Sequence, residues 1–187
     1  MNADGSNPTR LPIHEEDHAH DWSPDGKWLL TVSDRDRIRI NRGRYINYGY
    51  QIYAMHPDGK EVRRLTKDGV NLQPRYSPDG NKILYNHLRQ DKVEGGWWIM
   101  DADGGNPHEV YRREGETSSD TACWSPDGKR LALILFDWII DEKGNRILRP
   151  DENSNFRIAI LDADGKNRRE VSLENMKPLF LNDPEWR

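Results

Sequence analysis

The sequence is poor in cysteine, in long apolar runs and in excess charge of either sign. A single cysteine excludes an intramolecular disulfide and any paired-cysteine metal site. No run reaches the roughly 18 apolar residues expected of a membrane-spanning helix, so a membrane span is not expected. The counts of 28 Lys and Arg against 32 Asp and Glu give a formal net charge of −4, and no nucleic-acid partner is expected. The first ten residues contain no apolar stretch typical of a signal peptide.

The sequence does contain an internal repeat. An aromatic residue followed by Ser-Pro-Asp-Gly occurs three times, and each copy is followed by a second motif that ends in Asp-Gly. Seven tryptophans and seven tyrosines argue against disorder, because large rings bury much surface each. The first motif lies at 22–26, 76–80 and 124–128, and the second at 55–59, 100–104 and 161–165, with a further copy at 1–5.

Both motifs predict tight turns between strands. In the first motif proline supplies φ near −65°, aspartate follows, and glycine takes the left-handed position in both motifs. Short apolar segments flank each turn, and no stretch shows the 3.6-residue period of an amphipathic helix. Each repeat therefore predicts about four short strands, the pattern of a propeller blade.

The two motifs together resemble the PD40, or WD40-like, repeat of the TolB-like β-propeller family. The resemblance covers nearly the whole chain and implies an all-β fold of four-stranded antiparallel blades. Three full blades and two partial ones imply an open arc, whereas the family usually closes a ring of six or more blades. The expected units are the end of a preceding blade at 1–17, full blades at 18–66, 72–111 and 119–173, and the start of a further blade at 182–187.

Connectivity predicts that the short turns lie on one face and the long loops on the other. Long loops on a rigid scaffold are where binding sites usually lie. The insertion at 34–49 carries alternating arginines and several tyrosines, with Arg37, Arg39 and Tyr45 as candidate contacts for an anion or an acidic sugar. The alternative is a solvated ribbon, the more frequent role of such charge runs.

The first strand of each blade is expected to lie nearest the axis. His18 and His20 would point the same way on an extended strand, and two imidazoles could ligate one divalent metal there. Asp120 or Asn182 would supply an oxygen atom across the axis, and a resemblance to propeller oligogalacturonide lyases implies a place for Arg75 near a substrate carboxylate. The alternative is a polar, water-filled channel with no metal or other cofactor, which is favoured because spacing fixes no third ligand.

The resemblance implies a non-catalytic scaffold that binds a protein or another envelope macromolecule, in the periplasm or another extracytoplasmic setting. One alternative is a metal-dependent enzyme acting on acidic sugars, like the propeller oligogalacturonide lyases. Another is the propeller part of a prolyl-oligopeptidase-like peptidase. Because an open arc leaves its end blades without neighbours, two further hypotheses remain: a longer protein, or a homodimer in which two arcs complete a ring.

Overall fold

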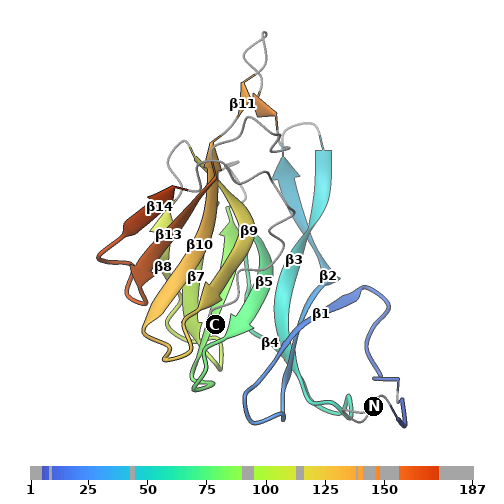
Figure 1. Cartoon of the computed structure of the whole chain (residues 1–187). Helices are drawn as coiled ribbons and strands as arrows, with labels where there is room; N and C mark the ends of the chain where they lie inside the picture. The colour runs from blue at the N-terminus through green and yellow to red at the C-terminus, as the bar shows by residue number, and fades with distance from the viewer. Residues whose placement is uncertain are drawn as a thin grey trace.

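The computed structural model describes residues 6–8, 10–42, 45–89, 95–112, 116–137, 139–140, 146–147 and 156–172. This part of the chain is all β, with three four-stranded antiparallel sheets, one small hairpin and no helix (Figure 1). The all-β prediction and the four-stranded units are confirmed. None of the described residues forms a helix that could cross a membrane.

Each sheet is a blade whose strands follow chain order from one edge to the other. The first blade comprises β1 (Asp17–Trp22), β2 (Leu29–Arg42), β3 (Tyr45–Met55) and β4 (Val62–Arg64). The second comprises β5 (Val70–Tyr76), β6 (Lys82–Leu88), β7 (Gly95–Asp101) and β8 (His108–Arg112). The third comprises β9 (Glu116–Trp124), β10 (Arg130–Asp137), β13 (Phe156–Asp162) and β14 (Arg169–Ser172), and its insertion forms the hairpin of β11 (Ile139–Ile140) and β12 (Arg146–Ile147).

The Ser-Pro-Asp-Gly motifs form the tight turns that the sequence predicts. In the second blade the Ser77 hydroxyl donates to the Asp79 carboxylate at 2.6 Å and accepts from the Lys82 backbone N–H at 2.9 Å. The same two hydrogen bonds recur in the other two blades. The turns of both motifs lie at one end of the blades, here called the turn face. The opposite end, where β2 and β3 extend and β11 and β12 pair, is called the hairpin face (Figure 1).

Apolar side chains between consecutive blades form two cores. Between the first and second blades, Leu30 and Ile52 face Ile83 and Met100, all with exposures of 1% or less. Between the second and third blades, Leu84 and Trp97 belong to a cluster that also contains Leu131, Leu133 and Leu161. Each blade therefore stabilises its neighbour, as expected in a repeat fold.

Position in the arc decides whether the anchor aromatic of each repeat is buried. Tyr76, the anchor aromatic of the second blade, is 9% exposed and packs against the first core. Trp124 also packs, against the second core. Trp22 is 46% exposed, because it occupies the same position in the first blade, which has no preceding four-stranded sheet among the described residues.

The segment before β1 has features of the end of a blade. Asn7 has a positive φ of 51°, matching 50° at Asn106 in the turn between β7 and β8. Pro12 lies so close to Gly59 that an added Cβ would meet its Cγ at 2.4 Å. The same close approach recurs at Gly165, where an added Cβ would lie 2.5 Å from the Val110 backbone oxygen. That a preceding blade ends in this segment stays a prediction.

Candidate functional site

The structure brings three of the predicted axial residues near one another. His18 and His20 lie on β1 and Arg75 on β5. Partial desolvation lowers the pKa of His20, and the positive charges of Arg75 and His18 lower it further. His18 is exposed, and its ring centroid lies 6.3 Å from that of Tyr50. The edge of the first blade therefore presents imidazoles beside a guanidinium.

The β1 strand is irregular at His20. Its pairing with β2 shifts register between Ala19 and Asp21, so His20 is the extra residue of a bulge. The simple alternation on which the predicted His18–His20 pair depended is therefore interrupted. The strands β5 and β9 show register shifts just before their own anchor aromatics, so the bulge belongs to the repeat.

The described residues do not complete a metal site. Within the described ranges, no group of three His, Cys, Asp or Glu side chains is placed to hold one ion. The Arg75 guanidinium next to His20 also opposes the binding of a cation. Asp120 lies on β9, but its side chain and the whole of Asn182 are outside the described residues. Metal binding at His18 and His20 therefore stays a prediction, for which the described residues supply no complete set of ligands.

The predicted hairpin-face contacts lie on a two-stranded ribbon. Pairing of β1 with β2 stops at Ser33, whereas β2 and β3 continue to pair from Ile38 to Arg42. Arg37 is exposed at the start of this ribbon. Arg39 pairs with Tyr48, and Arg42 with Tyr45, in the backbone register. The side chains of 38–42 and 45–48 are outside the described part.

Two ion pairs fix the base of this ribbon. Arg35 pairs with the Asp17 carboxylate, whose side chain is fully buried, and the Arg35 guanidinium lies 4.7 Å from the Tyr53 ring centroid. Asp36 accepts a hydrogen bond from Arg64 on β4 at 2.7 Å. The ribbon therefore starts from a rigid base rather than from a loose loop.

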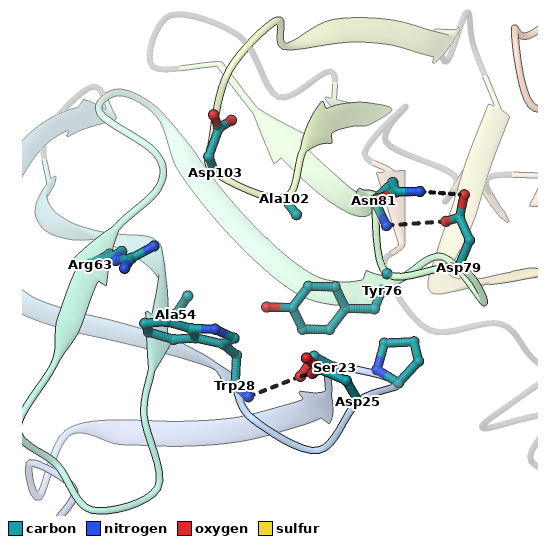
Figure 2. A pocket seen from close by; sticks show the side chains of 12 residues that line it. Ser23, Asp25, Trp28, Ala54, Arg63, Tyr76, Asp79, Asn81, Ala102 and Asp103 are labelled. Atoms are coloured by element: carbon teal, nitrogen blue, oxygen red, sulfur yellow. Dashed lines mark hydrogen bonds between the residues drawn. The ribbon is translucent and has the colours of Figure 1, made fainter.

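A cleft of about 580 Å³ opens on the turn face between the first and second blades (Figure 2). Trp28 and Tyr76 form its aromatic walls, and Ala54 and Ala102 contribute apolar surface. The Arg63 guanidinium lies 4.4 Å from the Trp28 ring centroid. Polar groups line the remainder: Ser23, Asp25, Asp79, Asn81 and Asp103.

Sequence reasoning missed this cleft, because its residues are parts of four separate turn regions. The usable indication was a departure from the repeat. Trp28 stands two residues after the turn glycine, where the other blades have Lys82 and Arg130. A bulky aromatic residue at an otherwise basic position marks this joint as different from the next one.

A second cavity, of about 430 Å³, lies beside a buried polar network at the same joint. The Thr66 hydroxyl donates to the Gln51 side-chain oxygen at 2.8 Å, and the Asn71 amide donates to the same oxygen at 3.2 Å. A His87 ring nitrogen lies 2.8 Å from the Asn71 side-chain oxygen. Burial lowers the pKa of His87. The network connects the first blade to the second, and its partners satisfy one another.

Comparison with known proteins gives matches in sequence and structure. No protein-family model matches the chain. An uncharacterized protein of Agrobacterium fabrum is 26% identical over 97% of the chain and 55% of its own length. The Tol-Pal system protein TolB of Thioalkalivibrio sulfidiphilus is 26% identical over 79% of the chain and 32% of its length. The chain thus spans about half the length of the first of these relatives and a third of the second.

The structural neighbours have the same architecture. A putative TolB from Agrobacterium tumefaciens matches with a TM-score of 0.62 and 26% identity, over 84% of this chain and 50% of that one. An oligogalacturonate lyase in complex with manganese matches with a TM-score of 0.54 at 15% identity, over 86% and 43%. An acylaminoacyl peptidase from Pyrococcus horikoshii matches with a TM-score of 0.56 at 18% identity, over 88% and 26%. At these identities the two enzymes share only the fold with this chain.

Proposed function

The chain is a TolB-like β-propeller, and from that premise we propose that it is a non-catalytic scaffold that binds a protein partner through its hairpin face. The observation that carries this proposal is the ribbon of β2 and β3, which continues beyond the edge of its blade. A projecting ribbon on a rigid base offers a large contact surface at little ordering cost. The arginines at alternate positions favour a partner with an acidic surface.

An extracytoplasmic location is part of the same proposal. One relative is named as a Tol-Pal system protein, and a structural neighbour is a putative TolB. The resemblance implies a periplasmic setting for such propellers. Fractionation of cells that produce the protein from its native gene should place it outside the cytoplasm, and recovery only with cytoplasmic markers would contradict this.

Site-specific photo-crosslinking tests the binding surface. A crosslinking amino acid at position 39 reports on the hairpin face, and one at position 60 reports on the turn face as a matched control. The partner trapped from position 39 is identified by mass spectrometry, purified and titrated against the chain. The charge reversal Arg37→Glu with Arg39→Glu should weaken binding by tenfold or more, while Lys60→Glu should leave it unchanged. Trapping of the same partner only from position 60 would refute the proposal.

A second candidate function, the lyase, is favoured by one observation: His18, His20 and Arg75 lie close together at the edge of the first blade. Digestion of trigalacturonate in the presence of manganese, followed by the absorbance of the unsaturated product, tests it. Turnover that is lost in His20→Ala would support the lyase and overturn the non-catalytic scaffold. The peptidase alternative has no comparable observation in its favour.

A further inference from the structure

The cleft between the first two blades is lined by two carboxylates that lack the lysine partner found in the other turns. Of the six described turns at 23–28, 56–61, 77–81, 102–106, 125–129 and 162–167, four have a lysine two residues after the turn aspartate: Lys27, Lys60, Lys129 and Lys166. Three of these lysines pair with that aspartate at 2.9 to 3.7 Å.

Both turns of the second blade lack this lysine. Asn81 and Gly105 occupy its position after Asp79 and Asp103. Neither carboxylate forms an ion pair with any residue in the described part, and both line the cleft. Hydrogen bonds from Ser77 and Asn81 lower the pKa of Asp79, so it remains ionised. Three of the other four turn aspartates are paired with a lysine, whereas the two at this joint are not.

The hydroxyl of a largely buried tyrosine lines the same cleft. Tyr76 is 9% exposed, and its phenolic oxygen is directed toward Trp28 across the cleft (Figure 2). No described residue forms a hydrogen bond with this hydroxyl. Burial, with Asp21 and Asp25 nearby, raises the pKa of Tyr76 to about 12, so the hydroxyl stays protonated. The hydroxyl is therefore open to a ligand in the cleft, to which it can donate or from which it can accept a hydrogen bond.

The basic residue already at the cleft does not cancel its acidic character. Arg63 stacks on Trp28, but its guanidinium is paired with the Glu61 carboxylate. The stacking of Arg63 on Trp28 also shows that the face of this ring can hold a cation. The interior therefore combines aromatic surface, two unneutralised carboxylates and an unpaired hydroxyl.

We propose that this cleft binds the side chain of an arginine presented by a basic peptide segment of a partner protein. The alkyl stem suits the apolar surface of Ala54, Ala102 and Trp28. The planar guanidinium has five N–H donors, which suit the carboxylate and hydroxyl oxygens that line the cleft. The volume of about 580 Å³ lies in the range of ligand pockets, about 300–1,000 Å³. The site is on the turn face and is independent of the hairpin-face scaffold function.

Titration of the full 187-residue chain with a short peptide tests the proposal. The probe is acetyl-Gly-Arg-Gly-amide, and the matched neutral peptide has citrulline in place of arginine. The Trp28 indole N–H resonance, assigned with Trp28→Phe, is followed by two-dimensional NMR. We expect a saturable shift with the arginine peptide that weakens as salt is added, and no shift with the citrulline peptide.

Three variants decide whether the proposed groups bind the probe. Asp103→Asn removes one charge, and Tyr76→Phe removes only the hydroxyl; each should weaken binding about fivefold. The control Asp164→Asn changes the equivalent turn of the third blade, where Lys166 already pairs, and should have no effect. Equal binding of the citrulline peptide would overturn the proposal. An equal effect of Asp103→Asn and Asp164→Asn would overturn it as well, because it would show only nonspecific attraction to the turn face.

Discussion

The spacing between the second and third blades should be sensitive to a single methyl group at Gly165. This residue has φ of +81°, and an added Cβ would lie 2.5 Å from the Val110 backbone oxygen. Gly26 is a natural reference: its φ is +70°, and an added Cβ would meet nothing within 4 Å. Both glycines have left-handed backbone, so alanine strains the backbone at each position. Only Gly165→Ala would also push the second and third blades apart.

The expected losses follow from these two contributions. Left-handed backbone costs an alanine about 1–2 kcal/mol, and this alone should apply to Gly26→Ala. Overpacking against a rigid backbone adds about 1–3 kcal/mol. Gly165→Ala should therefore lower the free energy of unfolding by about 2–5 kcal/mol in total.

Urea unfolding followed by tryptophan fluorescence measures both variants. The free energy is extrapolated to zero denaturant, and the dependence on urea should stay unchanged if both variants unfold in one step. If the two alanine variants lose the same stability, the close approach at Gly165 does not control blade spacing, and the argument from the Val110 contact is refuted.

Three further predictions use the same unfolding assay. Trp22→Ala should change stability by less than about 0.5 kcal/mol, whereas Trp124→Ala at the equivalent packed position should cost about 3 kcal/mol; equal losses would contradict the assigned packing. Arg35→Met should cost about 3–5 kcal/mol, because it leaves the Asp17 carboxylate buried without its ion partner; Arg35→Lys should retain most of the stability, and tolerance of Arg35→Met would show that the pair is dispensable. Because burial lowers the pKa of His87 from its ordinary value of 6.5, the stabilising effect of the neutral ring is present above pH 6.5 and is lost as pH falls below it. His87→Gln should therefore reduce the loss of stability between pH 7 and pH 5, and an unchanged pH dependence would contradict this.

The turns and the repeating unit could be predicted from the sequence because their determinants are local. Proline, aspartate and glycine set the backbone of each Ser-Pro-Asp-Gly turn within four residues, and the Ser77 hydrogen bonds close such a turn within six. The apolar segments between turns then predict strands, and the recurrence of the unit predicts its stacking. The resemblance of the motifs to TolB-like propellers agrees with the structural matches.

The candidate sites were less predictable. Alternation along an extended strand suggested that His18 and His20 share a direction, but a bulge interrupts the register at His20. The exposure of Trp22 reflects the lack of a preceding four-stranded sheet among the described residues, which the motif around it does not encode. The Arg35–Asp17 pair joins residues on different strands and has no local sequence pattern.

The strands, the tight turns and the four-stranded repeat follow from local sequence, because neighbouring residues carry the necessary backbone preferences. Only the tertiary structure revealed the cleft of Trp28, Tyr76, Asp79 and Asp103. These side chains come from turns and strands of two blades, and their proximity depends on how closely the blades pack. The missing lysines and the extra tryptophan are visible in the sequence, but their meaning depends on that packing, which places uncompensated charge and a free hydroxyl in one cavity.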